Sequence, residues 1–172
     1  MIEEALAQSG EMRAPHDVDR FLAMFLDHYQ ANIARNSRPY PHVVDEIVRL
    51  RSEGARVAVC TNKREALAVR LIGALALTDL FAAIIGRDTL PVSKPDPGHL
   101  TGTIARAGGD IRHAVMIGDS GVDVATARAA RVPVVGVTFG YSDVPMAELG
   151  ADATIDSYAN LSGVIRHLLM RE

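Results

Sequence analysis

The sequence is poor in the residues that mark secreted, membrane-spanning and nucleic-acid-binding proteins. Its 172 residues include one cysteine, no tryptophan and only 5% aromatic residues. Cys60 has no second cysteine for an internal disulfide, and no apolar run is long enough to span a bilayer. The net charge of −3 gives no basic surface for nucleic acid. Residues 1–10 are acidic and lack the apolar core of a signal peptide. We therefore expect a cytoplasmic protein with neither a nucleic-acid nor a membrane partner.

The chain does contain a regular alternation of short apolar runs and amphipathic segments. Hydrophobic residues make up 48% of it, which is enough for a sizeable core. The apolar runs show no polar alternation and are typical of strands buried on both faces, while the segments between them have helical spacing. This order predicts an α/β fold, a Rossmann-like parallel sheet with helices on both faces. We expect strands at 56–60, 82–86, 113–118, 132–138 and 151–155, and helices at 17–35, 42–53, 64–76, 97–107, 122–130 and 158–170.

Chemically capable residues stand next to the ends of these expected strands. The carboxyl ends of parallel strands meet at one edge of a sheet, where ligands bind. Thr61 offers a hydroxyl for a phosphate oxygen, and Lys94, in the stiff loop SKPDP, offers a point charge. Asp119 and Asp123 offer the hard oxygen ligands that suit Mg²⁺. Simpler interpretations stay open for each residue: a helix N-cap for Thr61, an exposed loop lysine for Lys94, and a favourable helix-dipole partner for Asp123.

The stretch GDSG at residues 118–121 raises a different hypothesis, because the same letters surround the serine nucleophile of trypsin-like proteases. Those enzymes are β-barrels, whereas this pattern is α/β. The motif continues as GDSGVD, and no histidine has a context that singles it out as a triad base. We therefore interpret Ser120 as a loop residue and the two neighbouring carboxylates as the chemically important groups.

The sequence combines three motifs in a fixed order: a strand followed by TN, then KPDP, then a strand followed by GDSxxD. In this combination it resembles the haloacid dehalogenase-like (HAD) hydrolases, and within them the phosphoglycolate phosphatase type. The resemblance covers about residue 17 to the end. It rests on VAVCTNK, GRDTLPVSKPDP, AVMIGDSGVDVATARAA and VPVVGVTFGYSDVPMAELGADATI. It implies Mg²⁺-dependent hydrolysis of a small phosphorylated metabolite.

The resemblance also implies a role for each matching residue. Thr61 would bind a phosphate oxygen through its hydroxyl, and Asn62 through its backbone N–H. Lys94 would neutralise the nucleophile and the phosphoryl charge. Asp119 would hold Mg²⁺, and Asp123 would support the metal or Lys94.

One part of the family pattern is missing from the sequence. These phosphatases use an attacking aspartate in a DxDGT motif, which follows an apolar strand between the strands that match 56–60 and 113–118. The only D-x-D near the start, at 17–19, opens an amphipathic helix and lacks both the apolar strand and the Gly-Thr. We expect residues 1–38 to be a remnant of a helical cap and 39–172 to be a core without its first strand. The sequence would then be a truncated form with little residual activity.

Two other functional classes remain as alternatives. One is a non-catalytic phosphate-binding or interaction module, a pseudo-phosphatase. The other is a receiver-type signalling domain, but the sequence shows no phosphoacceptor aspartate after an early strand. A missing central strand predicts poor folding, direct pairing of the flanking strands, or a strand borrowed from a partner, as in a homodimer. A smaller departure is Arg131, at a turn where the family has glycine.

Overall fold

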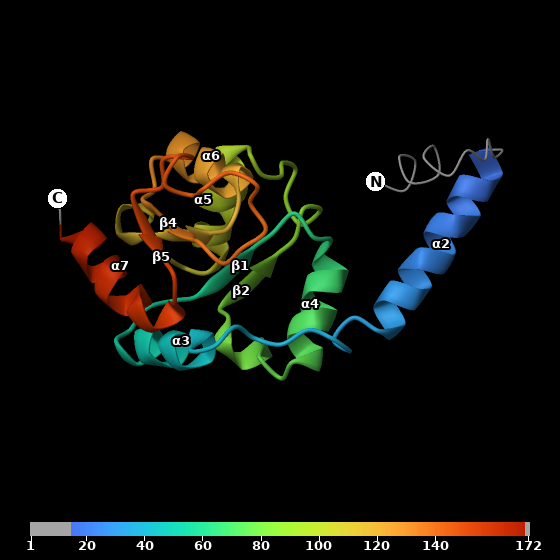
Figure 1. The fold of residues 1–172 in the computed structure, drawn as a ribbon, viewed down its shortest axis with the longest axis horizontal. Helices are drawn as coiled ribbons and strands as arrows, with labels where there is room; N and C mark the ends of the chain where they lie inside the picture. The colour runs from blue at the N-terminus through green and yellow to red at the C-terminus, as the bar shows by residue number, and fades with distance from the viewer. Residues whose placement is uncertain (1–14, 171–172) are drawn as a thin grey trace. The chain divides into compact units, whose positions relative to one another are not determined.

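The structure, a computed structural model, describes residues 15–170, with side chains from Arg20 onward. It divides into two units between Ser37 and Arg38, whereas the sequence predicts a boundary after residue 38. In the first unit, helix α2 (Pro15–Ala31) occupies most of the expected helix (Figure 1). The D-x-D at 17–19 lies within α2, and its side chains are outside the described part. That this unit is a cap remnant stays a prediction.

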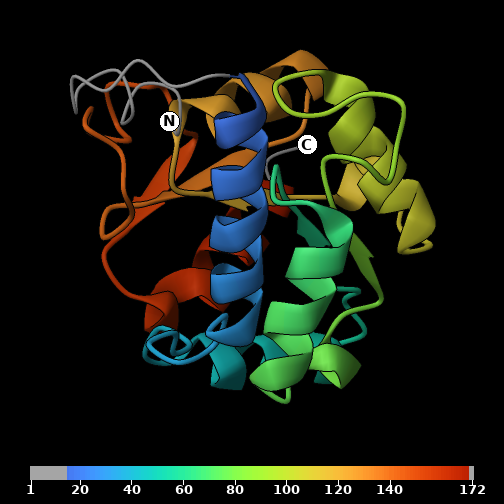
Figure 2. The same cartoon turned by 90° about the vertical axis from the view of Figure 1, so that its right-hand side faces the viewer.

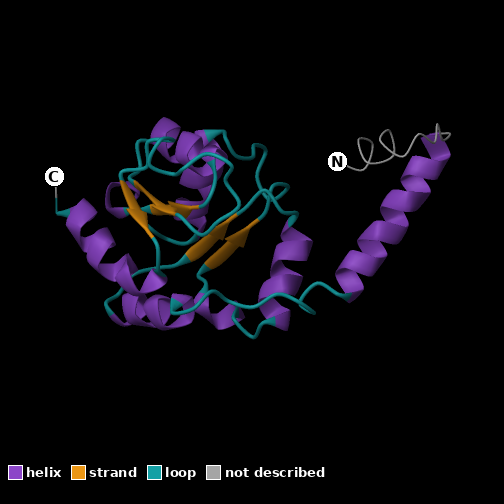
Figure 3. Cartoon of the chain, in the orientation of Figure 1, coloured by secondary structure: helices purple, strands orange, loops and turns teal. Residues whose placement is uncertain are grey.

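The second unit alternates short strands with helices, as the sequence predicts (Figures 1 and 3). Every strand falls within an expected apolar run but is only three or four residues long. The elements are α3 (Val43–Ser52), β1 (Ala58–Cys60), α4 (Glu65–Ala74), β2 (Ala83–Ile85), α5 (Pro97–Arg106), β3 (Met116–Gly118), α6 (Gly121–Ala130), β4 (Val134–Val137), β5 (Ala153–Ile155) and α7 (Leu161–Leu169). The parallel α/β class is confirmed.

Helices cover both faces of the sheet around β4, which is buried along its whole length. Successive side chains of a strand point to opposite faces. Val134 accordingly belongs to a core cluster that contains Ala127 of α6. Val135 belongs to the cluster on the opposite face, with Leu50 of α3 and Leu161 of α7. The turned view in Figure 2 shows α5 and α6 on the side of the sheet away from α3. These two apolar layers hold the sheet between them and so fix the positions of the strand ends.

Local signals in the sequence fix where the helices next to the loops begin and end. The Asp96 carboxylate caps α5 by accepting a hydrogen bond from the Gly98 N–H at 2.7 Å, and the Ser120 side chain caps α6. Arg131 follows α6 with φ 58°, the left-handed conformation in which glycine has no steric penalty. The turn therefore keeps the geometry of a glycine turn, although arginine occupies it.

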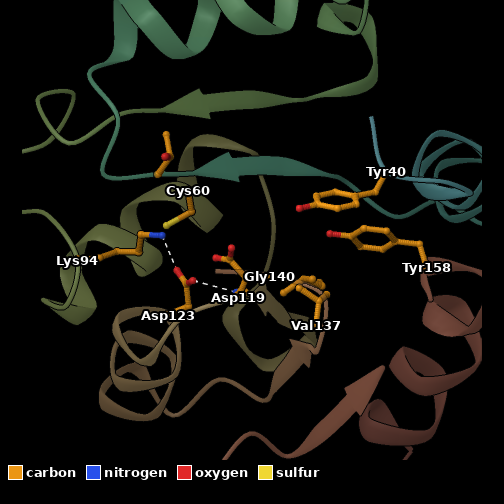
Figure 4. Close-up of a pocket in the computed structure, with 11 residues that line it drawn as sticks. Tyr40, Cys60, Lys94, Asp119, Asp123, Val137, Gly140 and Tyr158 are labelled. Carbon is orange, nitrogen blue, oxygen red and sulfur yellow. Dashed lines mark hydrogen bonds and ion pairs between the residues drawn. The ribbon is translucent and has the colours of Figure 1, made fainter. Parts of the chain in front are cut away.

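The strands form two sheets instead of one. Among the described strands, β1 pairs in parallel with β2, and β3, β4 and β5 pair in parallel in that order. Parallel partners bond through alternate residues, so the backbone groups of Ala58 and Cys60 face away from β2, and those of Ile117 face away from β4. In Figure 4, β1 runs between β2 and the residues of the three-stranded sheet.

This arrangement bears on two of the sequence predictions. The flanking strands β1 and β3 do not pair directly, so each keeps an open edge. The prediction that residues 56–60 form a strand buried on both faces is wrong, because all three residues of β1 are only half-buried. The residues of β1 stay partly exposed because, among the described strands, β1 has a neighbour on one side only.

Candidate active site

The carboxyl ends of β1 and β3 border a pocket of about 240 Å³ (Figure 4). Four residues that the sequence singles out line this pocket: Thr61, Lys94, Asp119 and Asp123. They come from three separate segments, namely the loop after β1, the loop before α5 and the turn between β3 and α6. The parallel topology brings these segments to one edge, as expected.

An ion pair joins two of these segments at the base of the pocket. Lys94 Nζ lies 2.5 Å from Asp123 Oδ1, and the two side chains are only 10% and 6% exposed. The second oxygen, Asp123 Oδ2, accepts hydrogen bonds from the Ser120 hydroxyl at 2.7 Å and from the Asp119 N–H at 3.2 Å. Protein donors therefore occupy both oxygens of Asp123. The carboxylate is placed to hold Lys94 and to fix the turn after β3.

The Ser120 hydroxyl has a structural task in this arrangement. It donates to Asp123 Oδ2 and accepts from the Asp123 N–H at 3.4 Å, which makes it the N-cap of α6. A serine nucleophile would instead bond to a general base, usually histidine. The geometry therefore gives no support to the protease hypothesis.

Asp119 differs from Asp123, because no hydrogen bond or ion pair holds its carboxylate among the residues that the structure describes. It lies in the pocket beside Gly140, where an added Cβ would collide with the Asp119 Cβ. Glycine at 140 thus makes room for the carboxylate. In the described part of the chain, no three His, Cys, Asp or Glu side chains converge as a metal cage would require. Mg²⁺, however, is commonly held by one or two carboxylates together with phosphate oxygens and water. Asp119 fits such an open site.

The loop after β1 contains Thr61 and Asn62, the two residues to which the resemblance assigns phosphate binding. The Thr61 hydroxyl accepts a hydrogen bond from the Lys63 N–H at 3.1 Å, which leaves the hydroxyl hydrogen free to donate. Thr61 is not a helix N-cap, since α4 begins at Glu65 and its first N–H bonds to Asp88 at 2.8 Å. Asn62 is outside the pocket lining, but its side chain donates to the Lys94 carbonyl at 3.0 Å and so ties the two loops together.

Sequence reasoning missed part of the pocket wall. Tyr40 and Tyr158 line it, and both pack against Phe139, with ring centroids 5.0 and 5.2 Å away. Burial, with smaller effects of Tyr40 and the Asp119 charge, raises the pKa of Tyr158. Cys60 also lines the pocket. Tyr40 lies in the segment before α3, and Tyr158 begins a short 3-10 helix three residues after the end of β5. Neither directly follows a strand, so inspecting the residues next to each strand end did not find them.

The comparisons with known proteins decide the family. A family model described as haloacid dehalogenase-like hydrolase matches residues 2–137. The chain belongs to the haloacid dehalogenase-like hydrolases. Among its HAD relatives, the phosphoglycolate phosphatase of Mesorhizobium japonicum is 47% identical over 171 residues, which are 99% of this chain and 75% of the relative. The phosphoglycolate phosphatase of Agrobacterium fabrum is 46% identical over 162 residues, covering 94% of this chain and 70% of the relative.

A solved HAD structure supports the same assignment. The crystal structure of a predicted phosphoglycolate phosphatase from Haemophilus somnus superimposes with a TM-score of 0.89 at 27% identity, covering 95% of this chain and 73% of that one. The family and these relatives support a phosphatase function. None of the described helices is both long and apolar enough to cross a bilayer.

Proposed function

We propose that this HAD chain forms the phosphate- and Mg²⁺-binding part of a phosphomonoesterase. Its substrate would be a small phosphorylated metabolite, and phosphoglycolate is the first candidate because the relatives described above carry that name. The observation that carries the proposal is the convergence of Thr61, Lys94 and Asp119 on one pocket at the sheet edge. A hydroxyl donor, a cation and a free carboxylate are together the groups that a phosphate and its metal ion require.

In this proposal each residue acts on the phosphoryl group in its own way. Lys94, held by Asp123, offsets the negative charge of the phosphoryl oxygens from a fixed position, which stabilises a transition state without reorganisation. The Thr61 hydroxyl and the Asn62 N–H bind two further oxygens. Asp119 would hold Mg²⁺, which supplies charge neutralisation when it is bound.

The step that these residues do not supply is nucleophilic attack. The resemblance places the attacking aspartate at the end of a strand between the family strands that correspond to β1 and β3, where the two sheets of this structure leave open edges. Without that carboxylate the covalent route is closed, and positioning alone leaves a small rate. Turnover would therefore depend on a strand that fills this position.

The test supplies the strand as a synthetic peptide. Release of phosphate from phosphoglycolate is measured for the 172-residue chain with Mg²⁺, alone and with a peptide of an apolar strand followed by Asp-x-Asp-Gly-Thr. We expect negligible turnover alone and measurable turnover with the peptide. The matched control is the same peptide with the first aspartate replaced by asparagine, which should give none. Equal rates with both peptides would contradict the proposal.

A second candidate function is a phosphate-binding module without catalysis. It is favoured by the Asp123 carboxylate, which is fully engaged by protein donors and cannot replace a missing nucleophile. This candidate predicts phosphate binding that depends on Lys94, with no turnover in the presence of either peptide.

A further inference from the structure

His99 is a completely buried histidine that the proposed chemistry does not use. It stands in the first turn of α5, five residues after Lys94, and has 0% exposure. Its Nε2 lies 3.0 Å from the Gly86 carbonyl oxygen at the end of β2. Its Nδ1 lies 3.3 Å from Cys60 Sγ at the end of β1. One imidazole ring therefore contacts the carboxyl ends of both strands of the smaller sheet.

The two hydrogen-bond partners of His99 determine which of its ring nitrogens carries a hydrogen. A carbonyl oxygen can only accept, so Nε2 carries a hydrogen and donates it to Gly86. An imidazole that carries its one hydrogen on Nε2 has Nδ1 as an acceptor. The Cys60 thiol then donates to Nδ1. Burial raises the pKa of this thiol, which keeps the proton that the bond requires.

These bonds lie directly beneath the phosphate-binding groups. Cys60 precedes Thr61, and the Arg87 N–H, next to Gly86, bonds to the Lys63 carbonyl at 3.0 Å. His99 itself follows the Lys94 loop at the start of α5. A displacement of the ring would therefore change the distance between the Thr61 hydroxyl and the Lys94 ammonium group.

We infer that His99 is a positioning residue, which locks the loop after β1 and the Lys94 loop at the spacing that one phosphate group requires. The inference rests on the proposed function for the identity of the ligand. A phenylalanine in the same place would fill a similar volume but would leave the Gly86 carbonyl and the Cys60 thiol without their ring partner. The role is thus separable from packing.

The first experiment measures the Kd of inorganic phosphate in the presence of Mg²⁺, by isothermal titration, for the wild-type chain and His99→Phe. Removing two buried hydrogen bonds should weaken binding about 10-fold or more. Cys60→Ser keeps a donor at Nδ1 and should bind nearly as well as wild type, whereas Cys60→Ala should be weaker than Cys60→Ser. The control is Ser162→Ala, which removes the buried hydrogen bond from the Ser162 hydroxyl to Glu46 on the opposite face and should leave the Kd unchanged.

A second measurement keeps the inference testable even if wild type binds no phosphate, an outcome that would overturn only the proposed function. Hydrogen exchange is followed at the amides of Lys63 and Arg87 in the loops, and at Val135 in β4. His99→Phe should speed exchange at Lys63 and Arg87 while Val135 stays protected. Equal acceleration at all three amides would mean that His99 only stabilises the fold as a whole. No acceleration at any of them would mean that His99 does not hold the two loops together. Either result overturns the inference.

Discussion

At the scale of single residues, the pocket depends on how two aspartates four positions apart are used differently. Asp123 has each oxygen bonded to a protein donor, whereas the Asp119 carboxylate has no hydrogen-bond or ion-pair partner among the described residues. The carboxylate that is held fixes Lys94, and the carboxylate that is free faces the pocket. This division follows from backbone position, because Asp119 directly follows β3 and Asp123 lies in the first turn of α6.

The buried Lys94–Asp123 pair predicts a clear stability effect. Lys94→Met leaves the Asp123 charge almost fully buried without its cation, which should lower the free energy of unfolding by about 3 kcal/mol. Adding Asp123→Asn removes the uncompensated charge and should restore much of the loss. Urea unfolding of the two single variants and the double variant measures this coupling. Equal stabilities for Lys94→Met and the double variant would show that the pair is not coupled.

At the scale of helices and strands, short polar contacts at the ends of elements decide how the core is closed. Glu46 of α3 accepts hydrogen bonds from the Ser162 N–H, at 2.9 Å, and from the Ser162 hydroxyl, in the first turn of α7. A buried carboxylate thus satisfies a helix start that would otherwise lack acceptors. This contact connects segments more than 100 residues apart in the chain.

The Glu46 contact predicts a loss of stability in acid. Burial raises the pKa of Glu46, but hydrogen bonds from Ser162 and the Arg49 charge together outweigh it and lower the pKa below the ordinary value of 4.5. The ionised carboxylate therefore stabilises the fold above about pH 4.5, and this contribution is lost as the pH falls through the lower folded value. As the pH is lowered below this value, the midpoint temperature of thermal unfolding should fall more steeply in wild type than in Glu46→Gln. The control is Glu148→Gln at an exposed position, which should show the same pH dependence as wild type. If the unfolding temperatures of wild type and Glu46→Gln fall in parallel, Glu46 is not the cause of the acid sensitivity.

The turn after α6 predicts a stabilising substitution. Arg131 has φ 58°, a conformation that costs a non-glycine residue about 1 kcal/mol. Arg131→Gly should therefore raise the free energy of unfolding by up to about 1 kcal/mol. The control is Ala125→Gly in the exposed middle of α6, which should lower it by about 1 kcal/mol. If both substitutions destabilise equally in denaturant titrations, the turn is not strained.

At the scale of the whole molecule, the most important feature is the separation of the strands into two sheets. Both open edges, at β1 and β3, border the pocket that collects Thr61, Lys94 and Asp119. A parallel strand inserted there could pair with the outward backbone groups of Cys60 and Ile117. Its carboxyl end would then reach the pocket, which links completion of the sheet to completion of the chemistry.

Much of this organisation could be predicted from the sequence, because buried strands in parallel α/β folds have a strong local signature and their ends must meet at one edge. Thr61 and Asp119 were predicted in this way, and Lys94 was predicted from the proline-stiffened loop SKPDP. The resemblance left open whether Asp123 supports the metal or Lys94. Residue spacing could not choose between the two, since 29 residues separate Lys94 from Asp123 and only packing brings them together. The roles of His99 and Tyr40 were equally hidden, because a buried histidine bridge and an aromatic wall have no local spacing rule.

The most direct test of the account is a titration of inorganic phosphate into the 172-residue chain with and without Mg²⁺, for wild type and Asp119→Ala. The Asp119 carboxylate has no hydrogen-bond or ion-pair partner to lose among the described residues, and Asp119→Ala keeps the backbone N–H that donates to Asp123, so the variant should fold normally and serve as a comparison. The account predicts that Mg²⁺ tightens phosphate binding in wild type and has no effect in Asp119→Ala. A chain that binds no phosphate, or an Asp119→Ala variant that keeps the full effect of Mg²⁺, would contradict the assignment of this pocket.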